Sequence, residues 1–267
     1  MENSSQTPSY DLVLATDLDG TLVGDDVALS RLNEWVVARR RRIVLVYLTG
    51  RHHSSACQLI EDAGLLLPDI LVHDVGTGIR YAPCYHPDPA WHRQVRQNWH
   101  PKEVREHLSI LPGLSPQPVP GDLRVSFFTA GPSESLARKA ARILRRAGLA
   151  AHVIASGGNL LDVLPARAGK GSALAYLQRY HRWRPATILV CGDTGNDRDM
   201  LSLGFPGVVV GNASPELKAA SLPPTVYRAL GAYAAGIWEA LQYRHSWSTE
   251  SSWGRMAALP ITRPGRP

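Results

Sequence analysis

The stretch Thr16-Asp17-Leu18-Asp19-Gly20-Thr21-Leu22 decides the fold class of this chain. It follows a short apolar run, residues 12–15, which indicates a buried strand of a parallel sheet. The two carboxylates of the stretch therefore fall at the carboxyl end of a strand, where open α/β sheets place their ligand chemistry. Gly20 lets the backbone turn sharply, so that the amides and the hydroxyl group around Thr21 can face the same point.

The close pair of carboxylates needs a physical reason. Without a counter-ion, Asp17 and Asp19 would repel each other and one pKa would rise, and a divalent cation such as Mg²⁺ removes that conflict. A carboxylate can also attack phosphorus, because an acyl phosphate divides a difficult hydrolysis into two easier steps. We predict that Asp17 is the nucleophile and a metal ligand, and that Asp19 protonates the leaving oxygen and later activates water. The alternative is an ordinary Asp/Gly turn.

Length and composition are consistent with an enzyme. At 267 residues with 44% hydrophobic content, the chain can bury a full core in one large domain or two smaller ones. Its three cysteines are odd in number and widely separated, which favours reduced intracellular thiols over a disulfide framework. The first ten residues are polar and no apolar run reaches transmembrane length, so we expect a cytoplasmic protein without a membrane partner.

The net charge of +6 raises the question of nucleic-acid binding. The densest basic run, Arg39-Arg40-Arg41-Arg42, falls at the end of a helix predicted over residues 27–41, where cations complement the helix dipole. The other arginines are scattered. We therefore predict no nucleic-acid partner, and we expect the charge to help attract an anionic substrate.

A second polar turn, Thr49-Gly50-Arg51, comes after a strand predicted over residues 43–48. A helix predicted over residues 52–63 starts next, and the free amides at its amino end favour anions. Thr49 is therefore placed to hydrogen-bond a phosphoryl oxygen. It could equally cap the helix without a ligand, and its position relative to Asp17 favours the first interpretation.

The composition changes after a third predicted strand, residues 70–73, and the segment 83–120 is rich in Pro, His and Trp. Trp91 and Trp99 could stack on a sugar ring, although such aromatics more often pack in the core. Together with residues 121–166, this segment makes an insert long enough for a small α/β domain. Its predicted elements are helices near 91–99 and 101–111, a strand over 123–129, an amphipathic helix over 133–147 and a strand over 150–155.

Two further polar segments come after the insert. Lys170 lies between two glycines at the start of a predicted helix, and by itself it could be a solvated surface lysine. The loop Gly192-Asp193-Thr194-Gly195-Asn196-Asp197 comes after a strand predicted over residues 187–191, with three types of polar ligand in five residues. We predict that Asp193 is a second metal carboxylate and that Asn196 and Asp197 hold water, Lys170 or phosphate oxygens.

These four loops, in this order, resemble the motifs of the haloacid dehalogenase superfamily of phosphotransferases: Asp-x-Asp-x-Thr, a Thr or Ser after the second strand, a Lys, and Gly-Asp-x-x-x-Asp. The resemblance runs from about residue 10 to 243. It implies an α/β fold, with a Rossmann-like doubly wound parallel-sheet core and an inserted smaller α/β cap domain. It implies Mg²⁺ held by Asp17, Asp19, Asp193 and Asp197, and phosphate held by Thr49, Lys170 and Asn196.

The division of the chain that this resemblance implies has five segments. They are an N-terminal tail, 1–9; the first part of the core domain, 10–82; the cap domain that recognises the substrate, 83–166; the second part of the core domain, 167–245; and a C-terminal tail, 246–267.

Within the superfamily, the chain most resembles the sucrose-phosphate phosphatases. The stretches that carry this likeness are 17–25, 75–79, 124–128, 156–158, 161–165 and 234–237. Two departures stand out: Asp19-Gly20-Thr21-Leu22 replaces Asp-Asn-Thr-Trp, and Gly76-Thr77-Gly78 replaces a turn that ends in Glu. Because this turn lacks the carboxylate, the resemblance does not identify the sugar. It still implies the same reaction.

The implied function is hydrolysis of sucrose 6-phosphate to sucrose and phosphate through an aspartyl-phosphate intermediate. Alternatives are the same chemistry on mannosylfructose phosphate, glucosylglycerol phosphate or mannosyl-3-phosphoglycerate, a phosphomutase, and a non-catalytic sugar-phosphate sensor. We expect a monomer, with a glycosyltransferase of the same pathway as a candidate partner. The predicted sugar contacts are Gly50, Arg51, Thr77, Asp162 and, in the loop from Gly157, Asn159.

Overall fold

The computed structural model describes residues 10–156 and 158–247. The predicted N-terminal tail, Gly157 and the predicted C-terminal tail from residue 248 onward lie outside the described residues. Among the described residues, none of the helices combines the length and apolar character needed to span a bilayer.

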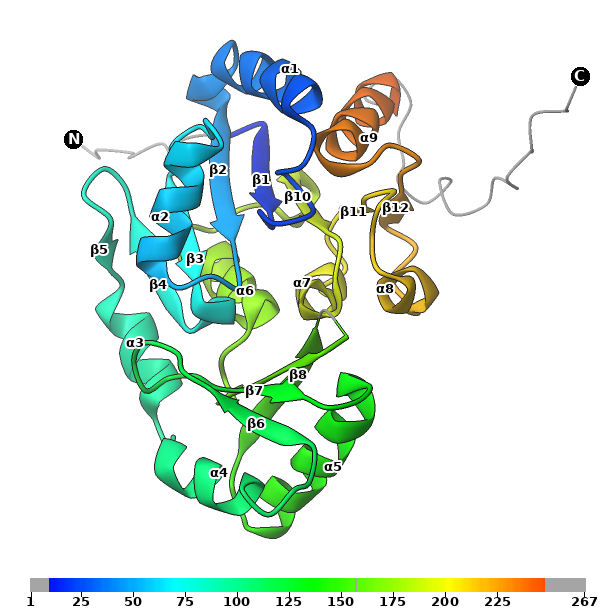
Figure 1. Ribbon diagram of the computed structural model, residues 1–267. Coiled ribbons are helices and arrows are strands. Elements are labelled where there is room, and N and C mark those ends of the chain that lie inside the picture. Colours follow the sequence, from blue (N-terminus) through cyan, green and yellow to red (C-terminus); the bar gives the residue numbers. More distant parts are fainter. Residues whose placement is uncertain (1–9, 157, 248–267) are drawn as a thin grey trace, which may run out of the picture.

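The larger of two sheets contains eight strands within the described residues, in the order β12-β11-β10-β1-β2-β3-β4-β5 (Figure 1). The strands from β12 to β3 are parallel, and β4 and β5 add an antiparallel edge. Their bounds are β1 Leu12–Thr16, β2 Ile43–Leu48, β3 Ile70–His73, β4 Gly78–Tyr81, β5 His86–Pro87, β10 Ile188–Gly192, β11 Gly207–Val209 and β12 Val226–Arg228.

Helices cover both faces of this sheet because its central strands are apolar on both sides. In β1, Leu12 and Leu14 pack into one core cluster, whereas Val13 and Ala15 pack into the other. The first cluster is covered by α1 Asp26–Val37, α2 His53–Asp62 and α9 Tyr233–Trp247. The second is covered by α3 Pro89–Arg96, α6 Lys170–Tyr180, α7 Arg198–Leu201 and α8 Pro215–Ala219. This arrangement confirms the predicted doubly wound α/β core.

The direction of strand order reverses at β1, which pairs with β2 on one side and with β10 on the other. Such a switch point leaves a crevice at the carboxyl ends of the strands, where ligands bind in open α/β sheets. The carboxyl ends of β1 and β2 face the insert in Figure 1. The three predicted polar turns after β1, β2 and β10 therefore meet at one edge of the sheet.

The insert forms a second, antiparallel sheet in the order β6-β7-β9-β8. One face packs on two helices through buried side chains that include Phe127 and Leu161. The opposite face carries Arg124, Ser126 and Asp162, because Ser126 and Asp162 are direct partners in the ladder and Arg124 precedes Ser126 by two residues. The elements are α4 Pro101–Leu108, β6 Leu114–Gln117, β7 Val125–Thr129, α5 Ser133–Arg146, β8 Ala151–Ser156 and β9 Leu160–Pro165.

The basic run differs from its prediction. Helix α1 ends at Val37, and Arg40–Arg42 form a separate short 3-10 helix that leads into β2. Arg40 pairs with Asp69 at 2.8 Å and Arg42 pairs with Asp11 at 2.6 Å. Arg40 and Arg42 are therefore used in ion pairs at the entry to β2 and do not complement the helix dipole as predicted. Arg39 does lie at the helix end, where it donates to the carbonyl of Trp35 in the last turn of α1 at 3.4 Å.

The boundary predicted at residue 83 precedes the point where the chain leaves the larger sheet. Strand β5 pairs with β4, and α3 places Trp91 in the core cluster beside that sheet. The Trp91 indole donates to the carbonyl of Gly76 at 3.2 Å, and Trp99 belongs to the core of the insert. Both tryptophans are core residues, which confirms the interpretation that they pack in the core and do not stack on a sugar ring.

Candidate active site

The turn after β1 places Asp17 at the centre of the site. Its backbone amide donates to the carbonyl of Cys191 on β10 at 3.0 Å, and its side chain is buried. Gly20 has a φ of 80°, and a Cβ there would lie 2.3 Å from Oδ2 of Asp193. Only glycine fits such a close approach in the left-handed region. The Thr21 hydroxyl donates to Oδ1 of Asp193 at 3.0 Å, which joins segments 172 residues apart.

Lys170 is fully buried and is no surface lysine. Its Nζ donates to Oδ1 of Asp17 at 2.6 Å, to Oδ1 of Asp197 at 2.7 Å and to Oδ1 of Asn196 at 3.0 Å. These three acceptors match the three donors of an ammonium group. Burial alone would lower the pKa of Lys170, but the two carboxylates outweigh it and raise that pKa above its usual value. The side chain therefore stays charged.

The loop after β10 folds around Asp197. Oδ2 of this carboxylate accepts the backbone amides of Asp193 at 2.9 Å and Thr194 at 3.0 Å, while Oδ1 accepts from Lys170. Asp197 is fully buried. Both of its oxygens thus hold neighbouring groups in place, which makes it the anchor of the loop that presents Asp193 and Asn196.

Three carboxylates converge beside Lys170. Asp17, Asp193 and Asp197 each offer an oxygen, and these oxygens lie within 4.8 Å of one another. Burial raises the pKa of Asp17 well above its usual value, with Asp197 and Asp193 adding to the effect and Lys170 opposing it. Burial, followed by Asp197, raises the pKa of Asp193 to about 7. This conflict of negative charge and this set of oxygen donors fit a hard divalent cation.

Asp19 does not join this acidic group. Its two oxygens accept from Nε and Nη2 of Arg51, each at 2.7 Å, and its side chain is 49% exposed. The planar fork of the guanidinium matches a carboxylate and turns Asp19 toward the second turn. The arrangement differs from the predicted metal ligation through the Asp19 carboxylate. It leaves Asp19 accessible to water and to a leaving group, as an acid–base residue requires.

Thr49 is fully buried at the end of β2. Helix α2 is capped by His52, whose Nδ1 accepts the amide of Ser55 at 3.1 Å, so the alternative that Thr49 caps this helix is wrong. The Oγ1 of Thr49 instead accepts the amide of Arg51 at 3.1 Å, which leaves its hydroxyl proton for another acceptor.

The predicted sugar contacts lie in different places. Gly50 and Arg51 belong to the turn that holds Thr49, and Thr77 is buried, with its hydroxyl donating to the carbonyl of Asp74 at 3.1 Å. Asp162 is buried in the insert, where Ser126 donates to it at 2.5 Å and burial raises its pKa. Asn159 is exposed at the start of the segment leading into β9.

Several residues of this region were missed by sequence reasoning. Arg124 from the insert donates to the carbonyl of Gly50 at 2.7 Å, and Asn212 donates to the carbonyl of Gly20 at 2.7 Å. Arg124 opens the stretch 124–128 that carries the likeness to the sucrose-phosphate phosphatases, but nothing in that stretch indicated its contact, and Asn212 belongs to no motif. Each acts on a backbone carbonyl far away in the sequence, and no pattern of residue types encodes such a contact.

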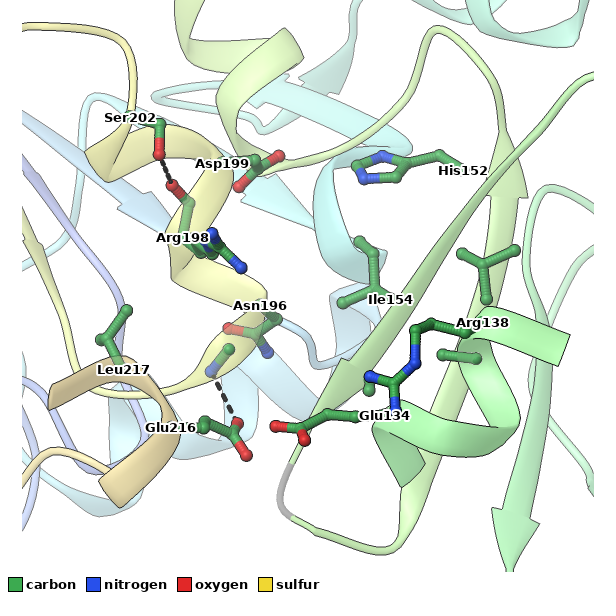
Figure 2. A pocket seen from close by; sticks show the side chains of 14 residues that line it. Glu134, Arg138, His152, Ile154, Asn196, Arg198, Asp199, Ser202, Glu216 and Leu217 are labelled. Carbon is green, nitrogen blue, oxygen red and sulfur yellow. Dashed lines mark hydrogen bonds between the residues drawn. The ribbon is translucent and has the colours of Figure 1, made fainter. Parts of the chain in front are cut away.

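A cavity of about 570 Å³ opens between the insert and the core beside Asn196 (Figure 2). The insert also touches the loop after β10 directly, since a Cβ on Gly195 would lie 2.9 Å from the carbonyl oxygen of Ala155 in β8. The two parts of the chain therefore meet at the loop that carries Asp193 and Asp197. Polar side chains that line the cavity include Glu134, Arg138, His152, Arg198, Asp199 and Glu216.

A family model and several curated relatives match this chain. The model of the sucrose-6F-phosphate phosphohydrolase family matches residues 10–245. Sucrose-phosphatase 1 of Nicotiana tabacum is 34% identical over 252 residues, which cover 88% of this chain and 59% of that protein. Probable sucrose-phosphatase 2 of Arabidopsis thaliana is 33% identical, with 90% and 61% covered. The chain thus spans about three fifths of the length of these plant relatives.

Two further relatives are covered more completely. Mannosylfructose-phosphate phosphatase of Agrobacterium fabrum is 32% identical, with 77% of this chain and 85% of that protein covered. The X-ray structure of the sucrose-phosphatase from Synechocystis sp. PCC6803, in complex with sucrose and phosphate, superposes with a TM-score of 0.82 at 32% identity. That match covers 88% of this chain and 98% of the other.

Proposed function

Because the chain belongs to the sucrose-6F-phosphate phosphohydrolase family, we propose that it is a Mg²⁺-dependent phosphatase that hydrolyses sucrose 6-phosphate to sucrose and phosphate. The observation that carries this proposal is the convergence of Asp17, Lys170 and Asp193 at the switch point of the sheet. A nucleophile, a fixed positive charge and a site suited to a divalent cation are the parts that phosphoryl transfer needs.

In the first step, a carboxylate oxygen of Asp17 attacks phosphorus, and the bond from phosphorus to the sugar oxygen breaks. Lys170 holds Oδ1 of Asp17, which leaves Oδ2 for the attack. Asp19 gives a proton to the sugar oxygen as it leaves. Thr49, Lys170 and Asn196 hold the phosphoryl oxygens, with Lys170 releasing one of its three present acceptors to do so. Positioning and electrostatic stabilisation thereby supply most of the catalysis.

In the second step, Asp19 removes a proton from water, which attacks the phosphorus of the aspartyl phosphate and releases inorganic phosphate and free Asp17. Asp17 and Asp193 would hold Mg²⁺, which neutralises negative charge on the phosphoryl group when it is bound. Asp197 would orient its neighbours, because its oxygens already accept from Lys170 and two amides.

We further propose that the insert is a cap that closes over the site and recognises the sugar. The polar face of its sheet, with Arg124, Ser126 and Asp162, is the candidate sugar-binding surface. Asn159 lies at the edge of this face. With β5 and α3 assigned to the core, the cap would begin near residue 97 and end near residue 166. The monomeric state, the cytoplasmic location and the glycosyltransferase partner stay predictions from the sequence.

A second candidate substrate is mannosylfructose phosphate, because a phosphatase of that substrate covers 77% of this chain at 32% identity. Gly78 stands where the turn of the sucrose-phosphate phosphatases ends in Glu, so the identity of the sugar does not follow from this turn. Both substrates would use the same chemistry, so only the relative catalytic efficiency distinguishes them.

The proposal is tested by phosphate release from purified protein on sucrose 6-phosphate, mannosylfructose phosphate and glucosylglycerol phosphate. We expect the highest kcat/KM for sucrose 6-phosphate, loss of activity with EDTA, and recovery with excess Mg²⁺. Release from none of the esters would exclude the phosphatase. Turnover that needs a bisphosphate and releases no phosphate would indicate a mutase, and binding without turnover would indicate a sensor.

Substitution of Asp19 by Ala should separate the two steps. The variant keeps its nucleophile but loses both the acid of the first step and the base of the second. The aspartyl phosphate should therefore form more slowly than in wild type and, once formed, hydrolyse slowly enough to be detected. Mass spectrometry of the intact protein after brief exposure to substrate should show the mass of one added phosphoryl group. Wild-type turnover by this variant would exclude Asp19 as the acid–base residue.

A further inference from the structure

One side chain of the insert contacts the turn Thr49-Gly50-Arg51 of the core, which we call the phosphate turn. Arg124, directly before β7, is nine-tenths buried. Its Nη1 donates to the carbonyl of Gly50 at 2.7 Å, and its Nη2 lies 3.2 Å from Oδ1 of Asp74. This guanidinium therefore crosses from the insert to the core at the turn that carries Thr49.

Three consecutive carbonyls of this turn are each held by a donor. The carbonyl of Thr49 accepts the amide of Val75 at 3.1 Å, and the carbonyl of Arg51 accepts the amide of Asp74 at 2.8 Å. The middle carbonyl, that of Gly50, accepts from Arg124. Two of the donors are backbone amides of the core, and the third is supplied by the insert.

The two core donors come from a turn with an unusual backbone. Asp74, Val75 and Gly76 have φ values of 49°, 55° and 92°, and a β-branched residue such as valine rarely adopts this region. The turn also lies against the start of α6, because a Cβ on Gly76 would be 2.2 Å from the carbonyl carbon of Gly169. Such a turn persists only where its surroundings hold it, and its location between Thr49 and Lys170 suggests a positioning role.

The contact with Gly50 acts on Thr49 through one peptide group. The carbonyl of Gly50 and the amide of Arg51 belong to the same planar unit, so fixing one fixes the other. That amide donates to Oγ1 of Thr49 at 3.1 Å. Arg124 is thereby linked to Oγ1 of Thr49 through the peptide group between Gly50 and Arg51.

The contact is poorly built for stability alone. Within the described residues, Nε of Arg124 and Oδ1 of Asp74 are buried and make no hydrogen bond, although the two residues form an ion pair. Buried charges with unsatisfied atoms are weak stabilisers, because desolvation offsets most of their attraction. The arrangement therefore favours a role in geometry.

We infer that Arg124 is a positioning residue that couples docking of the insert to the shape of the phosphate turn. When the insert is in place, Arg124 completes the set of donors on the three carbonyls and sets Thr49 for the phosphoryl group. When the insert moves away, the middle carbonyl loses its donor. This inference rests on the proposed function only in that the turn must bind a phosphoryl group.

The test compares Arg124→Met with Arg167→Met. Arg167 is the matched control, because it is an arginine at the other end of the insert that donates to Gln97 at 2.9 Å and is exposed. We expect Arg124→Met to lower kcat/KM on sucrose 6-phosphate by about tenfold to a hundredfold, since misplacement of a positioning group has effects of that size. Arg167→Met should stay within about twofold of wild type.

Binding of inorganic phosphate, measured by calorimetry with Mg²⁺, gives a readout that needs no turnover. The Kd should rise by about tenfold in Arg124→Met, because a charge-assisted contact has been lost from the turn. If wild type binds phosphate but hydrolyses no ester, the proposed function fails, and the Kd of the variant still decides this inference. Values for Arg124→Met within twofold of wild type in both assays would overturn it.

Two further variants distinguish loss of the positioning contact from loss of folding. Arg124→Lys keeps a donor for Gly50 and should recover part of the loss, and Arg124→Ala should regain activity when guanidinium is added well below denaturing concentrations. Thermal unfolding checks the fold of each variant. Arg124→Met and Arg124→Ala leave Asp74 without its partner and should unfold at a lower temperature than wild type, so the assays are run below the unfolding transition of every variant. No recovery by either route in folded protein would contradict the positioning role.

Discussion

Substitution of Asp17 by Asn should abolish phosphate release from sucrose 6-phosphate, with kcat reduced by at least about a thousandfold. The amide has the shape of the carboxylate, but it cannot attack phosphorus or form the acyl phosphate. It also removes one of three crowded carboxylates, so the site loses negative charge as well as its nucleophile.

The control for this variant is its fold. Thermal unfolding should remain a single transition near that of wild type, because Asn fills the same volume and still accepts a hydrogen bond from Lys170. Asp25→Asn is a matched substitution outside the acidic group, at the cap of α1, and should keep its activity. Wild-type activity in Asp17→Asn would remove the nucleophile assignment and the mechanism built on it.

Substitution of Lys170 by Met should reduce activity by a similar factor and also destabilise the fold. Three acceptors would lose their donor, and the acidic group would lose the cation that compensates it. Breaking a buried pair by removal of one partner costs about 3–5 kcal/mol. A fall of several degrees in the unfolding temperature should follow, whereas Lys139→Met on the exposed face of α5 should change neither property.

The stability loss in Lys170→Met should depend on pH when EDTA is present. Burial already raises the pKa of Asp17 and brings that of Asp193 to about 7, and removal of the ammonium raises the pKa of Asp17 further. For an acid with a raised pKa, the folded state binds the proton more tightly than the unfolded state, so protonation stabilises the fold. Lys170 also lowers the pKa of Asp193, so its removal moves that pKa above about 7, and the difference from wild type should shrink as pH falls through this range and below it. A difference that grows in that direction would contradict the assigned partners of Lys170.

The convergence of the site was predictable because its motifs come directly after strands. Asp17, Thr49 and Asp193 each come after an apolar run, and the carboxyl ends of parallel strands share one edge of a sheet. The likeness to the phosphatase superfamily supplied Lys170, whose sequence surroundings alone could not distinguish a buried lysine from a solvated one. Its three acceptors exist only in the folded chain.

The features that sequence reasoning missed depend on contacts between distant side chains. The pairing of Arg51 with Asp19 and the reach of Arg124 to Gly50 join residues that share no motif or period. Composition also did not indicate that the segment with Trp91 packs against the core, because its residues look unlike those of the core. Strand β6 went unpredicted, since an edge strand that contains proline carries little apolar signal.

The proposed mechanism requires Asp17 to be aligned for attack on phosphorus beside a cation held by the acidic group. This alignment can be observed in a crystal structure of the protein with Mg²⁺ and beryllium fluoride, a mimic of the acyl phosphate. We predict the beryllium bonded to a carboxylate oxygen of Asp17, Mg²⁺ held by Asp17 and Asp193, and Thr49 and Lys170 within hydrogen-bond distance of the fluorides. A fluoride complex bound away from Asp17, or a cation elsewhere with the acidic group empty, would contradict the account.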